Sequence, residues 1–217
     1  MTIRACAAIR TYTSARWRYA AGLCGLLAAL LAGCAVVPGD KERRDAVIAI
    51  NKAFRADYEA ILAENGTRVF NVTRAEAYDA VRVSMARLGM TVEAQDPVLG
   101  YVNVYAPAPR PLSDEEWEKA ATADLPRTRA IIGPHVGIFR HFFSFNPKGL
   151  QTVISATIVQ APAGAEISFT ARMREIAPPE SEDYPRREYL PPTAVRMALD
   201  KMWAELVREF TATVRRP

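Results

Sequence analysis

The stretch QTVISATIVQAPAGAEISFTARMRE, residues 151–175, decides the fold. Apolar and polar residues alternate along both of its halves, which is the pattern of a β-strand with one buried face. Ile154 and Ile158 share a face in the first half, and the same alternation runs over residues 167–174 in the second half. A Pro-Ala-Gly turn at residues 162–164 separates the halves. The sequence therefore predicts two adjacent antiparallel strands.

Residues 68–106 predict a β-α-β-β unit. A short strand over residues 68–72 precedes Thr73 and Glu76, which have the spacing of a helix-capping box. The helix behind them is expected to end at Gly89, and two strands joined by an Asp-Pro turn complete the unit. The first of these two strands is expected to direct three apolar side chains inward: Met90, Val92 and Ala94.

Two further helices are predicted at the ends of the folded part. Apolar residues at spacings of three and four predict one helix from about Arg44 to Glu64. A long C-terminal helix is expected behind Thr193 as its cap. Its apolar face comprises Val195, Leu199, Met202, Leu206 and Phe210. Because short connections require antiparallel strands, we expect an α+β fold: an antiparallel sheet of five to six strands with helices packed on one face.

The segment between these units is the least regular part of the sequence. A capping box at Ser113 and Glu116 predicts a helix, which Pro126 is expected to end. Residues 131–145 are apolar and aromatic without alternation. They are interpreted either as a strand buried on both faces or as an exposed patch or lid that serves a partner or an acyl ligand. The candidate surface consists of Phe139, Arg140, His141, Phe142 and Phe143.

The charge distribution argues against a nucleic-acid partner. The chain of 217 residues has a net charge of +4, but residues 1–33 contain four arginines and no acidic residue. Without them, 24 basic and 24 acidic residues remain, so no net positive field is left to attract phosphate. With 50% apolar and 24% charged residues, the composition is that of a folded protein.

The N-terminal arginines are followed by an apolar stretch, which is the layout of a secretory signal. The stretch ends in Leu31, Ala32, Gly33 and Cys34, which resembles a bacterial lipobox. This resemblance implies cleavage before Cys34 and a diacylglyceryl and N-acyl lipid on that residue. The expected organisation is a signal peptide over 1–33, a lipidated tether over 34–43, a helix over 44–66 and one α+β domain over 67–217. An uncleaved anchor helix is the alternative.

The resemblance also predicts where the protein resides. Ala35 follows the cysteine, where the family's signal for retention in the inner membrane is typically Asp. The expected destination is therefore the outer membrane, facing the periplasm. Cys6 and Cys24 leave with the signal peptide, so the mature domain is expected to contain no disulfide.

The pattern of elements in the mature domain resembles the small α+β domains of several envelope lipoproteins, including a lipoprotein component of the outer-membrane barrel-assembly machinery. The resemblance covers roughly residues 68–210 and matches no functional residue. It implies a noncatalytic module of the envelope.

The sequence contains no set of residues that indicates catalysis or metal binding. In the predicted mature chain the histidines are His135 and His141, whose even offset would place both on one face of a strand. Ser144 lacks the Gly-x-Ser-x-Gly turn of a hydrolase. We therefore predict no enzyme activity, no metal and no cofactor.

Two functions remain as hypotheses. The first is a membrane-anchored, noncatalytic module that binds another envelope protein or assists envelope assembly. The second is a carrier or sensor of a small apolar ligand held between the sheet and the C-terminal helix. Its cavity would be lined by Phe169, Met173, Met202 and Phe210.

Overall fold

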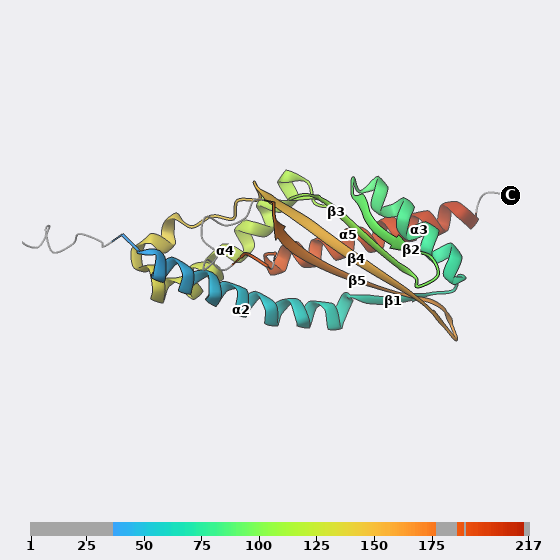
Figure 1. Cartoon of the computed structure of the whole chain (residues 1–217), viewed down its shortest axis with the longest axis horizontal. Helices are drawn as coiled ribbons and strands as arrows, with labels where there is room; N and C mark the ends of the chain where they lie inside the picture. Colours follow the sequence, from blue (N-terminus) through green and yellow to red (C-terminus); the bar gives the residue numbers. More distant parts are fainter. Residues whose placement is uncertain (1–36, 177–185, 189, 215–217) are drawn as a thin grey trace, which may run out of the picture. The chain divides into compact units, whose positions relative to one another are not determined.

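The computed structural model describes residues 37–176, 186–188 and 190–214. The described residues from Pro38 onward form one compact unit, and α2 belongs to it together with the sheet. Figure 1 shows its elements, which follow the order α-β-α-β-β-α-3₁₀-β-β-α. The elements are α2 (Asp40–Asn65), β1 (Thr67–Phe70), α3 (Arg74–Arg87), β2 (Thr91–Asp96), β3 (Tyr101–Pro107), α4 (Asp114–Val136), η1 (Gly137–Phe142), β4 (Leu150–Ala161), β5 (Gly164–Glu175) and α5 (Pro192–Val214).

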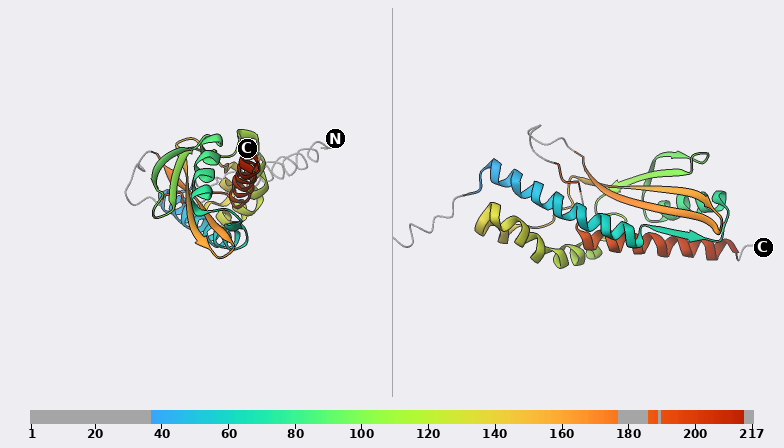
Figure 2. Two further views of the ribbon diagram at one scale, coloured as in Figure 1. Left: turned by 90° about the vertical axis from the view of Figure 1, so that its right-hand side faces the viewer. Right: turned by 90° about the horizontal axis from the view of Figure 1, so that it is seen from below.

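The strands form one antiparallel sheet in the order β1-β5-β4-β3-β2. The predicted α+β architecture is confirmed, with five strands. Helix α3 contacts β3, β4 and β5, and Trp203 of α5 packs on Phe169 of β5 with 4.6 Å between ring centroids. These helices cover the face on which Ile154 and Ile167 are fully buried. Figure 2 shows α5 running along this side of the sheet.

The hairpin that decides the fold brings together the inward faces predicted for its two strands. Ile154 pairs with Ala171 and Ile158 with Ile167, so the apolar positions of both strands share the buried face. Gly164 follows the turn with a φ of +127°, a conformation that favours glycine. A Cβ at this position would lie 2.0 Å from the carbonyl oxygen of Phe70, so the glycine also permits the close approach of β1.

The predicted β-α-β-β unit is present over β1, α3, β2 and β3. Thr73 and Glu76 form both hydrogen bonds of the capping box. Val92 lies opposite the buried Val104 and so faces the helices as predicted, although its place on the edge strand leaves it 39% exposed. The inward orientation predicted for Ala94 is wrong, because Ala94 lies opposite Asn103 on the other face of the sheet. The register with β3 shifts between Val92 and Ala94, and such a bulge interrupts the alternation of faces. Met90 is buried as expected.

The first helix begins earlier than predicted. It starts at Asp40, four residues before Arg44, so residues 40–43 belong to the helix rather than to the tether. Its buried side chains include Phe54, Tyr58 and Ile61, which follow the predicted spacing. A longer helix leaves a shorter connection to Cys34.

The prediction that Pro126 ends a helix is wrong. Helix α4 continues through Pro126 to Val136 and ends where Gly137 has a φ of +56°. A proline inside a helix removes the N–H that would bond to the carbonyl of Thr122. Thr122 and Pro126 are both exposed, so solvent can satisfy that carbonyl. The helix is held by its packing against α2 and α5.

Helix α5 begins at Pro192, one residue before the predicted cap. Thr193 lies in the first turn, where its N–H and hydroxyl donate to the two carboxylate oxygens of Asp124 at 2.8 and 2.7 Å. The Asp124 carboxylate of α4 therefore accepts hydrogen bonds from the first turn of α5, where backbone N–H groups have no partner within the helix. The predicted apolar face is buried at its first four positions, and Phe210 is partly buried.

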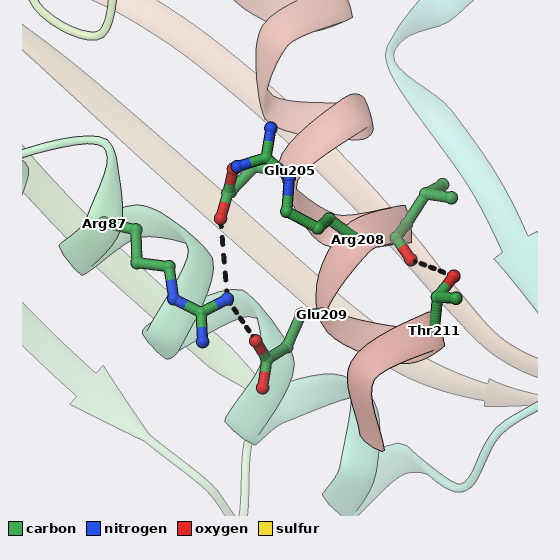
Figure 3. A network of polar contacts seen from close by, with 6 residues as sticks. Arg87, Glu205, Arg208, Glu209 and Thr211 are labelled. Atoms are coloured by element: carbon green, nitrogen blue, oxygen red, sulfur yellow. Dashed lines mark hydrogen bonds and ion pairs between the residues drawn. The ribbon is translucent and has the colours of Figure 1, made fainter. Parts of the chain in front are cut away.

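A network of charges joins α3 to the end of α5 (Figure 3). Arg87 forms ion pairs with Glu205 and Glu209, whose side chains are only 7% and 10% exposed. Glu205 also accepts from Arg208 at 2.9 Å. The two carboxylates lie one helical turn apart, so the guanidinium of Arg87 reduces their mutual repulsion.

A second ion pair joins α4 to α5 and perturbs a titratable group. The ammonium of Lys201 donates to Glu116 at 2.5 Å, and the N–H of Ser113 donates to the same carboxylate at 2.6 Å. These two hydrogen bonds, with that from Lys201 the larger cause, lower the pKa of Glu116 below its ordinary value. The predicted capping box at Ser113 is confirmed and has an additional partner.

We expect Lys201→Met to lower the free energy of unfolding by about 0.5–1 kcal/mol at pH 7. Because the pKa of Glu116 is lower in the folded state, its contribution is present above the unfolded value of about 4.3 and is lost as the pH falls through the folded value. The difference between variant and wild type should therefore shrink towards pH 3. Urea titrations at pH 7 and pH 3 measure it, with Lys119→Met as the exposed control on α4. A difference that grows on acidification would contradict this sign.

Candidate functional site

The predicted lipidation motif lies outside the described residues. This applies to Leu31, Ala32, Gly33 and Cys34. The chain enters the compact unit at Pro38, which is buried and whose carbonyl accepts from Nε of Arg43 at 3.1 Å. Pro38 is four residues after Cys34, so the backbone between them spans at most ~15 Å.

The candidate surface is helical from Phe139 to Phe142, and Phe143 follows in extended conformation, so the interpretation of residues 131–145 as one strand is wrong. Its first part is the end of α4, and residues 137–142 form the 3₁₀-helix η1. Gly133 within α4 approaches Arg140, because a Cβ there would lie 2.9 Å from a guanidinium nitrogen. The short η1 therefore folds back against the last turns of α4.

The aromatic side chains of this segment have different environments. Phe142 is 79% exposed and Ile138 is 60% exposed. Phe139 is half-buried, and its ring lies 6.2 Å from that of Phe142. Phe143 points into the molecule, where it meets the edge of Phe145 at 5.1 Å. We call residues 137–143 the apolar tip. Its exposed apolar side chains are those of Ile138 and Phe142.

The two histidines do not share a strand face, so that prediction is wrong. His135 is in the last turn of α4 and His141 is in η1. The backbone carbonyl of His141 accepts from Arg129 at 2.9 Å, and its Nε2 lies 3.4 Å from Nε of Arg140. Within the residues that the structure describes, no group of His, Cys, Asp or Glu has the arrangement of a metal site.

The apolar tip belongs to a stretch of the sequence without acidic residues. Residues 125–165 contain no Asp or Glu, whereas they include Arg127, Arg129, Arg140 and Lys148. Arg127 pairs with Asp57 of α2, and this ion pair raises the pKa of Arg127. Arg140 is exposed on the tip itself. The segment therefore combines exposed apolar side chains with cationic ones.

The tip lies beside the start of α2. The pair Arg127–Asp57 joins the middle of α4 to the second half of α2. From there α4 runs back along α2, and its end lies close to the first turns of α2 in both Figure 1 and Figure 2. Val47 and Ile50 of α2 line a common cavity with Phe143. The tip and the point where the chain enters at Pro38 are therefore at the same end of the unit.

This cavity has a volume of about 80 Å³ and is mainly apolar. Cavities of about 150 Å³ are known to hold a benzene ring, so this one is too small for an acyl chain. The residues that line it include Val47, Ile50, Phe54, Trp117, Phe145 and Met173. Of the residues predicted to hold an apolar ligand, only Met173 lines it.

The other residues predicted for such a ligand pack against neighbouring side chains. Phe169 and Met202 are 1% and 0% exposed. Phe169 contacts Trp203, and the ring of Phe210 lies 4.9 Å from that of Phe70. These side chains contribute to the core between sheet and helix.

The sheet face opposite α3 and α5 carries a group of residues that the sequence analysis did not identify as candidates. Tyr101 and Tyr105 of β3 are half-buried on this face, where Tyr105 pairs with Val153 and Val153 with Arg172. We call Tyr101, Tyr105, Val153 and Arg172 the open-face group. Its signal in the sequence is the second set of alternating positions in the strand predicted to end at residue 106.

No protein family, curated protein or solved structure matches this chain in the comparisons made. Over the described part of the chain, no helix has the length and apolar character needed to cross a bilayer.

Proposed function

We propose that this chain is a lipid-anchored, noncatalytic protein of the bacterial envelope that binds another envelope protein. The proposed anchor is Cys34 with its diacylglyceryl and N-acyl lipid. The proposed location is the periplasmic face of the outer membrane, on the basis of the lipobox and Ala35. The resemblance to envelope lipoproteins supports the same class of function.

The observation that carries the proposal is the position of the lipobox directly before a folded unit. Cys34 is six residues from Asp40, where α2 begins. A link of this length keeps the unit within about 20 Å of the bilayer. Tethering two proteins to one membrane raises their effective concentration, so a modest interface is sufficient for binding.

The open-face group is the surface we propose for the partner. Tyrosine and arginine are enriched at protein interfaces because they combine apolar area with polar ends. Tyr105, Val153 and Arg172 lie side by side across three adjacent strands. The extended face of a sheet offers these side chains without rearrangement of the backbone.

The anchor is tested with the full chain and its Cys34→Ser variant, expressed in a bacterium. We expect the wild-type protein to lack residues 1–33, to carry the mass of the lipid and to partition into detergent. The variant should retain its leader and lose the lipid, because a hydroxyl does not replace the thiol as acceptor. Intact mass spectrometry measures both. Identical processing and partitioning of the two proteins would contradict the anchor.

The partner surface is tested in the same strains with a photo-crosslinking amino acid at Tyr105. We expect a discrete crosslinked protein from the anchored chain and several-fold less from the Cys34→Ser chain. The control position is Val207, which is 47% exposed on α5. Equal crosslinking from Tyr105 and Val207 would contradict the open face as the interface.

A further inference from the structure

We infer that the apolar tip inserts into the surface of the same bilayer that holds the lipid of Cys34, where it meets anionic headgroups. The tip is thus a second contact between the protein and the membrane. This inference rests on the proposed lipid anchor.

The first argument is the exposure of the tip. Phe142 and Ile138 are 79% and 60% exposed on one short helix, and the ring of Phe139 lies 6.2 Å from that of Phe142. A single exposed apolar residue is ordinary. Several exposed apolar side chains beside a half-buried aromatic ring, here that of Phe139, are typical of a contact surface. In a bilayer, aromatic and branched side chains at such positions leave water without requiring a partner of matching shape.

The second argument is the location of the tip. The chain enters the unit at Pro38, and the antiparallel pairing of α2 and α4 brings η1 to that same end. The backbone from Cys34 to Pro38 spans at most ~15 Å. A lipid on Cys34 therefore holds this end of the unit, rather than the end with the β2–β3 turn, close to the headgroups.

The third argument is charge. Within residues 137–143 no residue is acidic and Arg140 is exposed, whereas Arg127 further back on α4 is paired with Asp57. The first turns of α2 beside it are balanced, since Lys41, Arg43 and Arg44 are matched in number by Asp40, Glu42 and Asp45. A cationic residue among apolar ones places its charge at the phosphates while the apolar side chains lie deeper.

The consequence for the proposed function is orientation. A lipid on one flexible link fixes the distance of the unit from the bilayer but leaves its rotation free. A second contact on η1 restricts this rotation and so presents the open-face group in a defined direction. Partner binding then costs less rotational entropy, because the unit is already oriented on the membrane.

The test places a polarity-sensitive nitrobenzoxadiazole label at Phe142→Cys in the full chain. The protein is purified from membranes and reconstituted in vesicles of phosphatidylethanolamine and phosphatidylglycerol. The matched control is Leu99→Cys, a 68% exposed apolar position in the β2–β3 turn. No cysteine follows Cys34, so each variant has one new thiol in the predicted mature chain.

We expect the label at 142 to give a blue-shifted emission with several-fold higher intensity and to be quenched by brominated lipids. The label at 99 should emit as in water. The inference would be overturned if the labels at 142 and 99 gave the same emission, whether both emit as in water or both emit as in lipid. Protection of position 142 only after addition of envelope proteins would overturn it as well, because the tip would then be a protein interface.

The same samples separate this inference from the proposed anchor. If Cys34 is not lipidated, the parent chain itself reacts with the label, and its mass shows no lipid. The anchor proposal then fails, and the tip is tested on the unlipidated chain added to the same vesicles. If lipidation is found and position 142 still emits as in water, the anchor stands and the tip inference fails.

Discussion

Replacement of Trp203 by alanine should lower the free energy of unfolding by about 3–5 kcal/mol, which is the usual cost of removing a buried tryptophan. Trp203 is 1% exposed and packs on Phe169 of β5 and Phe70 of β1. Its Nε1 donates to the carbonyl of Asn65 at the end of α2, at 2.8 Å. One side chain thus connects α5 to the sheet and to the first helix.

The measurement is urea unfolding followed by far-ultraviolet circular dichroism, because the substitution removes one of the chain's three tryptophans and so changes the fluorescence signal itself. Trp203→Phe keeps most of the ring and removes the N–H, so it should cost about 1–2 kcal/mol with the Asn65 carbonyl left without this donor. Val207→Ala, on the exposed side of α5, should change the value by less than about 0.5 kcal/mol. A loss below about 1 kcal/mol for Trp203→Ala would show that the core repacks around the gap.

Replacement of Arg87 by alanine should cost about 2–3 kcal/mol at neutral pH, because Glu205 and Glu209 lose the guanidinium that lies between them. The figure is below the value for a fully buried pair, since the side chain of Arg87 is itself 43% exposed. The repulsion between two carboxylates one turn apart then acts in a poorly hydrated place.

The matched comparison is Arg82→Ala on the same helix. Arg82 pairs with Asp79 at 3.4 Å, and both side chains are exposed, so this variant should be nearly neutral. Combining Arg87→Ala with Glu205→Gln and Glu209→Gln should restore part of the lost stability, because amides do not repel one another. If Arg87→Ala and Arg82→Ala have the same effect, the network contributes no more than a surface ion pair.

Local patterns predicted the sheet well, because apolar and polar residues alternate along a strand that has one buried face. Ile154 and Ile167 could be assigned to the core from their neighbours alone. The capping boxes at Thr73 and Ser113 were equally local. Ala94 could not be assigned to the correct face, since the bulge between Val92 and Ala94 depends on pairing with β3 and cannot be recognised within the strand itself.

The candidate site was predicted in part. The sequence identified residues 139–143 as unusual, but Pro126 was interpreted as a helix end, so the segment behind it was taken for a strand. Contacts with α2 and α5, which are distant in sequence, hold α4 through that proline. The burial of Glu205 and Glu209 was not foreseen for the same reason, because their partner Arg87 lies on another helix.

The order in which the chain is made has a consequence for how it folds. Trp203 and Asn65 are 138 residues apart in sequence, and β1 pairs with β5 across about a hundred residues. The core between sheet and helices therefore stays open until α5, the last element, has emerged. Folding of this core should accordingly start only after α5 has been synthesised, and a chain that stops before Pro192 should be captured by chaperones or degraded.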